Sequence, residues 1–377
     1  MKKLISILLV MILLMSAAAA ETVIRPTEDR GITVNPAGTN TVPDGISPTT
    51  GRTLAELTAP DGYAGLAVTG RYMPALVQID NTLGGTGYRA PRGLLYTDVI
   101  YESPLTTAGE TRLTFLFSDL IPDDVGPTRS ARVLHAWLRE EWDCAFVRYG
   151  QQEYPPTNVY DVFFATGANK KEVLFNGTDG PAKPWKKFFY KDPILTSPHD
   201  KFANVAAMVT TIVPDDFSAA DRAWLFTDEL PTAGDEAEMI RVSWNVKSDY
   251  NSILEWDDEE QCYYRYMITY KYGKESGYEA YVDYNYRQDP VTFSNIIVQF
   301  TDFEYPGSDA PLPTVLGKGN ADYFIGGRHI AGVWQRDDLS SRTVFYGPDG
   351  NEIELQRGRT LIVIMDHNIS GRSISYE

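Results

Sequence analysis

The chain has 377 residues, a mass of 42.2 kDa and a formal charge of −17, from 34 Lys+Arg against 51 Asp+Glu. This acidity argues against nucleic-acid binding, which needs a basic surface, and against electrostatic attachment to anionic lipid. Two cysteines are too few for a disulfide-stapled scaffold or a cysteine-rich zinc module. The hydrophobic fraction of 43% can form a sizeable core, and the length predicts about two domains.

The first 20 residues have the features of a secretory signal peptide. Two lysines precede an apolar stretch at residues 4–15, and the small residues 16–20 offer an A-x-A cleavage site before Glu21. Cleavage there would change the formal charge to −19 and give an extracytoplasmic protein, secreted or associated with the cell envelope. The alternative is an uncleaved anchor over residues 4–20, which would attach the protein to the membrane through this segment only. No lipoprotein cysteine follows the apolar stretch.

Residues 21–53 are rich in Pro, Gly, Thr and Asn, lack periodicity, and are predicted to form an extended linker. A first domain is expected over residues 54–236, with a layered α/β architecture in which helices cover a mixed sheet. Its predicted strands are 75–80, 94–102, 112–117 and 145–147, and its predicted helices are 130–142, 201–211 and 218–226.

A β-rich second domain is expected over residues 237–369, which makes the whole chain an α+β protein. Strands 263–272 and 278–286 are predicted to form a hairpin with tyrosines at alternate positions on one face. Such a face commonly packs on a core, although tyrosines also stack on sugar rings or contact a protein partner. Shorter strands are predicted at 241–246, 295–300, 323–325, 330–334, 343–346, 353–355 and 360–365.

The two cysteines, Cys144 and Cys262, lie one in each half of the chain. An extracytoplasmic location permits a disulfide between the halves, and two separately buried thiols are the alternative.

The common catalytic motifs are missing from the sequence. There is no H-E-x-x-H, G-x-S-x-G or S-x-x-K motif, and the four histidines are scattered. Gly317-Lys318-Gly319 lacks both the hydroxyl residue and the following helix of a phosphate-binding loop. We therefore predict no metal and no cofactor, and the lack of a recognisable nucleophile favours a protein that is not an enzyme.

The strongest local signal is Gly126-Pro127-Thr128-Arg129-Ser130-Ala131-Arg132, which places two arginines at the start of a predicted helix. Free N–H groups and the helix dipole favour an anion there, and Arg112 and the segment 197–201 would join this site if the fold brings them close. The alternative is that Arg129 and Arg132 pair with internal acids such as Asp80 and Glu102 and brace the sheet. Thr128 or Ser130 is expected to cap the helix.

Several segments resemble a known family. Val77-Gln78-Ile79-Asp80-Asn81, Asp98-Val99-Ile100-Tyr101-Glu102, Gly109-Glu110-Thr111-Arg112 and the Gly126–Arg132 segment resemble the N-terminal domain of the YerB-like bacterial envelope proteins (the DUF3048 family), and Ser197-Pro198-His199-Asp200 resembles its Pro-His-Asn segment. Tyr264-Arg265, Asn295-Ile296-Ile297-Val298, Gly317-Lys318-Gly319, Gly332-Val333-Trp334, Asp349-Gly350 and Gly358 resemble its C-terminal domain. The resemblance covers residues 57–215 and 238–368.

The resemblance implies an extracytoplasmic protein with a layered α/β first domain and a β-rich second one, and it implies no established reaction. Two features depart from the family pattern. The usual lipoprotein cysteine is missing, and a His-x-Gly-x-Ser-like stretch is replaced by Arg148-Tyr149-Gly150-Gln151-Gln152.

These observations favour a secreted cell-envelope protein that binds an anionic ligand, either a peptidoglycan fragment or a wall polymer. The expected ligand-binding residues are Arg129, Arg132, Arg112, Ser130, Asp80, Asn81, Glu102 and His199. Two alternatives remain at this point: an envelope hydrolase that uses a carboxylate or His199 as general base, and a structural module that contacts an envelope protein through its tyrosines.

Overall fold

The computed structural model describes residues 21–24, 28–82, 91–220, 222–307, 309–366 and 368–377. The expected signal peptide at residues 1–20 lies outside these ranges. Within them, no helix combines the length and apolar character that crossing a membrane requires. Strands make up 39% of the structure and helices 13%, which confirms the predicted α+β, β-rich fold.

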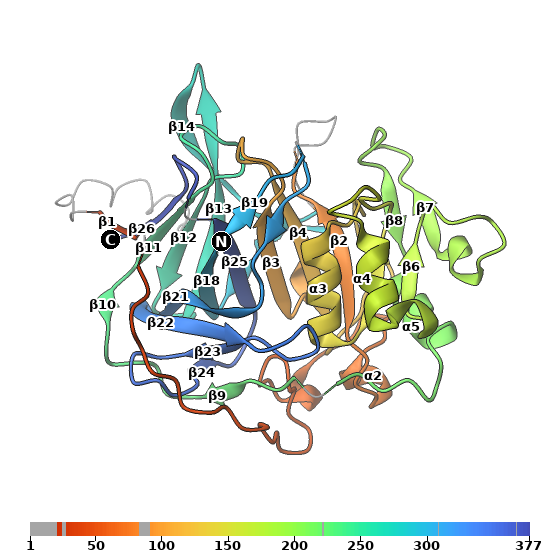
Figure 1. The fold of residues 1–377 in the computed structure, drawn as a ribbon, viewed down its shortest axis with the longest axis horizontal. Helices are drawn as coiled ribbons and strands as arrows, with labels where there is room; N and C mark the ends of the chain where they lie inside the picture. The colour runs from red at the N-terminus through yellow and green to blue at the C-terminus, as the bar shows by residue number, and fades with distance from the viewer. Residues whose placement is uncertain (1–20, 25–27, 83–90, 221, 308, 367) are drawn as a thin grey trace.

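The central element is a sheet of eleven strands within the described residues (Figure 1). Its order is β10–β22–β21–β18–β25–β3–β4–β2–β5–β6, with β23 paired to β22. The strands are β2 (Ala75–Asp80), β3 (Val99–Pro104), β4 (Thr111–Phe117), β5 (Ala145–Arg148), β6 (Leu174–Asn176), β10 (Asp235–Glu236), β18 (Asn295–Thr301), β21 (Gly317–Ile325), β22 (Arg328–Arg336), β23 (Val344–Tyr346) and β25 (Thr360–Asp366).

Strands from both expected domains share this sheet. β25 pairs in parallel with β3, with Thr360 opposite Val99, and on its other side β25 pairs in parallel with β18. The two halves of the chain are therefore joined by backbone hydrogen bonds in the middle of the sheet. The boundaries expected at residues 53, 236 and 369 stay predictions.

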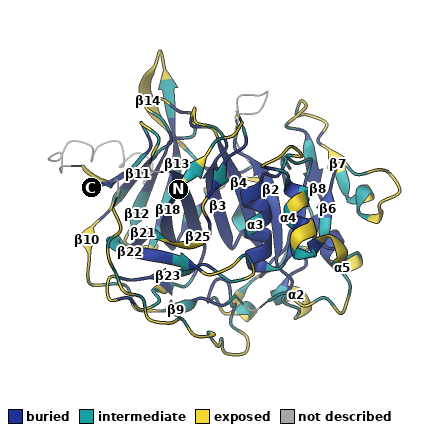
Figure 2. Cartoon of the chain, viewed as in Figure 1, coloured by how far each residue is buried: buried dark blue, intermediate teal, exposed yellow. Residues whose placement is uncertain are grey.

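The central sheet is buried on both faces (Figure 2). On one face, α3 (Val133–Trp142) packs Leu134 and Leu138 against strand residues such as Leu76. The opposite face carries Val77 and other residues of a second core cluster. The remaining helices are α2 (Leu66–Thr69), α4 (Val159–Thr166), α5 (Val205–Thr211), η1 (Leu54–Glu56), η2 (Leu94–Tyr96), η3 (Ala168–Lys170) and η4 (Pro184–Phe188).

A second sheet of seven described strands has the order β1–β26–β11–β12–β13–β14, with β17 beside β13. Its strands are β1 (Thr22–Ile24), β11 (Met239–Ser243), β12 (Ser252–Asp257), β13 (Cys262–Lys271), β14 (Lys274–Ala280), β17 (Thr292–Phe293) and β26 (Ser373–Tyr376). Two-stranded pairs are formed by β7 (Phe189–Lys191) with β8 (Lys201–Ala203), β9 (Leu225–Thr227) with β24 (Glu354–Gln356), β15 (Val282–Asp283) with β16 (Tyr286–Pro290), and β19 (Phe303–Glu304) with β20 (Leu312–Pro313).

β13 and β14 form a hairpin that projects from the body of the molecule (Figure 1). The first strand has nearly the predicted bounds, but the second was predicted at residues 278–286 and runs instead over Lys274–Ala280, after which β15 and β16 form a separate pair. The turn is tighter than expected, because Tyr272 and Gly273 both have positive φ angles, of 53° and 72°. This geometry fits a two-residue hairpin connection. The alternate tyrosines lie on the outer side of the sheet: Tyr264 and Tyr266 are half-buried, and Tyr272 is 94% exposed.

Two predicted helices were wrong in whole or in part. Residues 218–226 form no helix where they are described, and the chain is extended there before β9. Trp224 is buried with its ring 5.6 Å from that of Trp142, and β9 pairs with β24, so tertiary packing overrides local helix propensity. In the segment 201–211, β8 comes first, and α5 begins only after Asn204, whose side chain accepts a hydrogen bond from the Ala207 N–H at 2.8 Å.

The segment expected to be a linker is extended, and several side chains tie it to the folded body. Arg30 donates two hydrogen bonds to the buried carboxylate of Asp322, at 2.9 and 2.8 Å. Ser47 and Thr50 both donate to the buried carboxylate of Asp119, each at 2.6 Å. Cys144 and Cys262 are free thiols, and burial raises the pKa of Cys144 to about 12.

Candidate anion-binding site

Three parallel strands end at one edge of the central sheet. β2 pairs in parallel with β5, and β5 pairs in parallel with β6, so their carboxyl ends at Asp80, Arg148 and Asn176 lie together. The Gly126–Arg132 segment lies at the same edge, because the Tyr149 N–H donates to the Arg129 carbonyl and the Ala131 N–H donates to the Gly150 carbonyl, both at 3.0 Å. Carboxyl ends of parallel strands are the usual location of ligand sites in sheets of this kind.

Asp80 is the central acid of this edge and is almost fully buried. Its Oδ2 atom lies 2.6 Å from Nδ1 of His199 and 3.5 Å from Nε of Arg129. Its Oδ1 atom accepts hydrogen bonds from the hydroxyl and the N–H of Thr82, at 2.8 and 3.1 Å. Burial raises the pKa of Asp80, but Arg112, Arg129, Thr82 and His199 together outweigh it and hold the pKa below the ordinary value. Asp80 is therefore ionised at neutral pH.

Arg112 lies opposite Asp80 in the register of β4 against β2 and is 2% exposed. Its Nη1 atom donates to the carbonyl of Ser130 at 3.2 Å, while its Nε atom has no hydrogen-bond partner in the described residues. Burial, together with the charges of Arg132 and Arg129 and against the opposing effect of Asp80, lowers the pKa of Arg112 to about 9. This is a buried cation with an unused donor.

Arg129 and Arg132 lie on either side of Ser130 and face different acids. Arg129 contacts Asp80 and keeps 22% of its side chain exposed. Arg132 instead pairs with Asp309, with Nη2 2.6 Å from Oδ2, and also donates to the carbonyl of Asp309. Within the described part of the chain, Arg129 and Arg132 therefore each form an ion pair with one carboxylate, while Arg112 lies near Asp80 without a direct ion pair.

Neither Thr128 nor Ser130, the two residues expected to cap the helix, is its N-cap; that position is held by Arg132. α3 starts at Val133, and Nδ1 of His135 accepts a hydrogen bond from the Arg132 N–H at 2.9 Å. Burial, followed by the charges of Arg112 and Arg132, lowers the pKa of His135 well below its ordinary value, so the imidazole is neutral. Ser130 instead donates its hydroxyl to the carbonyl of Tyr149 at 3.1 Å.

Two of the predicted site residues, Asn81 and Glu102, lie deeper than the others. Both are fully buried, and Asn81 donates to Glu102 at 3.2 Å. Glu102 forms a fully buried ion pair with Arg265 on β13. These residues brace the contact between the two halves of the chain behind the site.

Sequence reasoning missed Arg148 and Gln151. Arg148 is buried and donates from Nε to Gln151 Oε1 at 2.8 Å, but its Nη1 atom and the Gln151 Nε2 atom have no partner in the described residues. Burial lowers the pKa of Arg148 to about 10. A charged residue directly after the short apolar run of β5 was the available signal, because such a residue marks the end of a buried strand.

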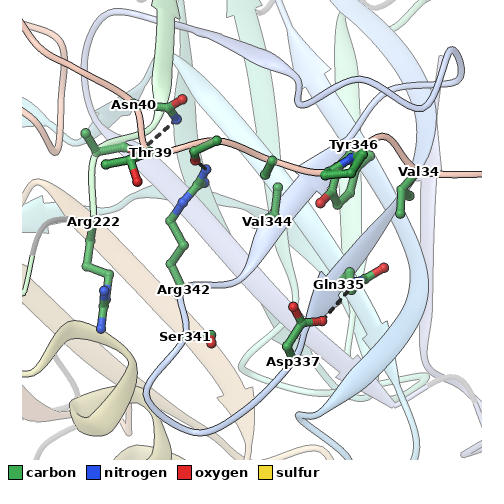
Figure 3. Close-up of a pocket in the computed structure, with 14 residues that line it drawn as sticks. Val34, Thr39, Asn40, Arg222, Gln335, Asp337, Ser341, Arg342, Val344 and Tyr346 are labelled. Atoms are coloured by element: carbon green, nitrogen blue, oxygen red, sulfur yellow. Dashed lines mark hydrogen bonds between the residues drawn. The ribbon is translucent and has the colours of Figure 1, made fainter.

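A cavity of about 500 Å³ lies elsewhere, between the extended N-terminal segment and the β22–β23 region (Figure 3). Its wall includes Arg342, whose two Nη atoms are already paired with Glu352 at 2.5 and 2.6 Å. The described residues contain no group of three His, Cys, Asp or Glu side chains that could hold a metal ion. Among these residues, buried arginine nitrogens without a partner also occur at Arg92, Arg265 and Arg372. At the edge of β2, β5 and β6, two such arginines, Arg112 and Arg148, lie beside the partly exposed Arg129, and this combination marks the candidate site.

Two family models match the chain. The DUF3048 N-terminal domain, described as belonging to a protein of unknown function, matches residues 63–218, and the corresponding C-terminal domain matches residues 240–362. These matches span most of the chain, which belongs to the DUF3048 family.

The fold is similar to that of a solved structure, the YerB protein from Bacillus subtilis. The TM-score is 0.63, and the match covers 87% of this chain and 99% of that chain. The sequences are 20% identical, so the likeness concerns the fold alone. The family resemblance predicted from the sequence is thus confirmed. A comparison with curated proteins finds no match.

Proposed function

We propose that this protein is an extracytoplasmic cell-envelope protein that binds an anionic ligand through Arg112 and Arg129. Arg132 adds positive charge beside them, but its own guanidinium nitrogens are already hydrogen-bonded within the chain. The ligand class is a carboxylate-bearing peptidoglycan fragment or a phosphate-bearing wall polymer. The observation that carries the proposal is the surplus of cationic donors at the edge of β2, β5 and β6, above all the unused Nε of buried Arg112.

Physical chemistry supports this assignment. A buried arginine without a full set of acceptors destabilises the folded state, because the hydrogen bonds that it lost to water are not all replaced by hydrogen bonds within the protein. An anion supplies acceptors in the planar geometry that guanidinium groups match well. Arg129 is the partly exposed member of the cluster, so an arriving anion would meet it first.

Calorimetric titration of residues 21–377 tests the proposal, with glycerol 3-phosphate and N-acetylmuramoyl dipeptide as probes. We expect one of the two to bind, and Arg129→Ala to weaken that binding at least about tenfold, as expected for loss of a charged hydrogen bond. Arg241→Ala is the matched control, because Arg241 pairs with Glu275 on the outer side of the second sheet. Loss of thermal stability in Arg129→Ala, with neither probe bound by the unmodified chain, would leave only a bracing role.

The expected location has a separate test. Expression with the complete N-terminus in a bacterial host should yield an exported protein whose mass corresponds to a chain beginning at Glu21. An intact mass in the membrane fraction would instead favour the uncleaved anchor.

A further inference from the structure

His199 and Asp80 form a hydrogen-bonded pair at the same edge as the arginines. Asp80 Oδ2 lies 2.6 Å from Nδ1 of His199, and the other oxygen of Asp80 is held by Thr82. An ionised carboxylate accepts, so Nδ1 carries the proton and Nε2 is the basic nitrogen. Within the described residues Nε2 has no hydrogen-bond partner, and the His199 side chain is 20% exposed.

We propose that His199, oriented by Asp80, is the general base of a metal-independent hydrolytic site for phosphodiesters, with Arg129 holding the phosphodiester anion beside it. This inference rests on the proposed anion binding and assigns a reaction to the same site. Asp80 is a positioning residue: it fixes the imidazole and stabilises the imidazolium that forms.

The charges at the site favour a phosphodiester over a neutral ester. Arg129 Nε contacts the same Asp80 oxygen as His199, so a cation lies directly beside the base. Arg112 and Arg132 add positive charge close by, and the pKa of Arg112 is lowered in part by Arg132 and Arg129. A phosphodiester carries one negative charge when it binds and gains more during attack, which is the charge that preorganised arginines stabilise.

The proposed reaction is the hydrolysis of one ester bond of the phosphodiester by water. The water oxygen forms a bond to phosphorus while Nε2 of His199 takes a proton from that water. The bond from phosphorus to the leaving alcohol oxygen breaks, and the imidazolium returns the proton to that oxygen. The products are a phosphomonoester and an alcohol, and no other reactant is consumed.

The chain contains a second His–Asp pair that serves as an internal control. His329 Nε2 lies 2.6 Å from Asp322 Oδ1, the same distance as in the first pair. However, Asp322 is already bound at both oxygens by Arg30, and His329 stacks on Tyr376 with ring centroids 4.6 Å apart. The Arg30 Nη1 atom is also used, by the carbonyls of Ala321 and Gly332. Among the described residues, both Nη atoms of the arginine beside this pair are thus already used.

The test measures 4-nitrophenolate release from bis(4-nitrophenyl) phosphate by residues 21–377, with 4-nitrophenyl acetate and 4-nitrophenyl phosphate as comparison substrates. We expect the largest rate enhancement over the rate in buffer alone for the diester. His199→Asn should lower kcat about 100-fold or more, in the range of general-base catalysis. His329→Asn should leave kcat within about twofold when rates are expressed per folded molecule, since the reaction does not use it.

Two further readouts separate catalysis from folding and binding. Asp80→Asn should lower kcat with little change in KM and should alter the pH dependence of kcat, which a merely structural role would not do. His199→Asn should still bind glycerol 3-phosphate, whereas Arg129→Ala should not.

Glycerol 3-phosphate binding without hydrolysis of the diester would overturn this inference and leave the proposed function intact. Absence of hydrolysis together with no binding of either glycerol 3-phosphate or N-acetylmuramoyl dipeptide would overturn both. A larger rate enhancement for the acetate ester than for the diester, or equal losses in His199→Asn and His329→Asn, would also overturn the assignment.

Discussion

The two His–Asp pairs differ in how their arginines are used. Around Asp322, the two Nη atoms of Arg30 donate to one carboxylate and two carbonyls. These hydrogen bonds hold the extended N-terminal segment on the central sheet. Around Asp80, Arg112 keeps an unused nitrogen and Arg129 stays partly exposed. An arginine whose Nη atoms are all bound to a carboxylate and carbonyls indicates a structural contact. An unused donor beside a partly exposed arginine, at the carboxyl ends of parallel strands, indicates a place for a ligand.

Arg30→Met should show the largest effect if this distinction holds. It would leave the buried carboxylate of Asp322 without its cation, which costs about 3 kcal/mol in the free energy of unfolding. Urea denaturation at neutral pH measures the loss. If Arg30→Met proved nearly as stable as the unmodified chain, the Arg30 contact would not be structural, and the proposed difference between the two His–Asp pairs would be wrong.

Asp80→Asn should have a smaller effect that depends on pH. Because the pKa of Asp80 is lowered in the folded state, its stabilising contribution is complete above the ordinary aspartate pKa and disappears as the pH falls below about 4. We therefore expect the variant to be less stable than the unmodified chain at pH 7, by about 2 kcal/mol, the usual contribution of hydrogen bonds to a charged group. The difference should shrink at pH 2–3, as the pH falls toward the lowered pKa of Asp80. Denaturation curves at both pH values check this, and a pH-independent difference would contradict it.

Arg112→Met should have the smallest effect on stability of the three. Removing a buried cation with an unused nitrogen should change the free energy of unfolding by no more than about 1 kcal/mol, in either direction, because the lost pairing is offset by the desolvation cost that disappears. Asp80 keeps Arg129 and His199 as partners. The same variant should lose glycerol 3-phosphate binding. If Arg112→Met lowered the free energy of unfolding as much as Arg30→Met, Arg112 would have a structural role, and the two regions would not differ in this respect.

Local patterns in the sequence were enough to predict several strands of the central sheet, but they missed β12, β26 and α4. β2 has the predicted bounds, and β4, β5, β18 and β25 lie within a residue or two of them, because each is a short apolar run between polar residues or turns. The helix predicted over residues 218–226 was wrong because contacts with residues distant in sequence determine the structure there. Trp224 packs on Trp142, and β9 pairs with β24.

The site was only partly predictable. The cluster of Arg112, Arg129, Asp80 and His199 followed from charge and motif, and the structure brings these residues together. The partner of Arg132 is Asp309, far away in sequence, and no local pattern points to it. Asn81 and Glu102 were expected near a ligand, but contacts with Arg265 from the second half of the chain place them behind the site.

The position of β25 has a consequence for the order of folding. This strand comes from residues 360–366, yet it fills the gap between β18 and β3 in the middle of the central sheet. Until it is in place, β3 presents an unpaired backbone edge, the kind of edge that invites pairing with other chains. Closing so long a loop is slow, and the partly folded chain stays prone to aggregation meanwhile. The edge of β3, in the first third of the polypeptide, is therefore covered only after the last tenth of the polypeptide has folded onto it.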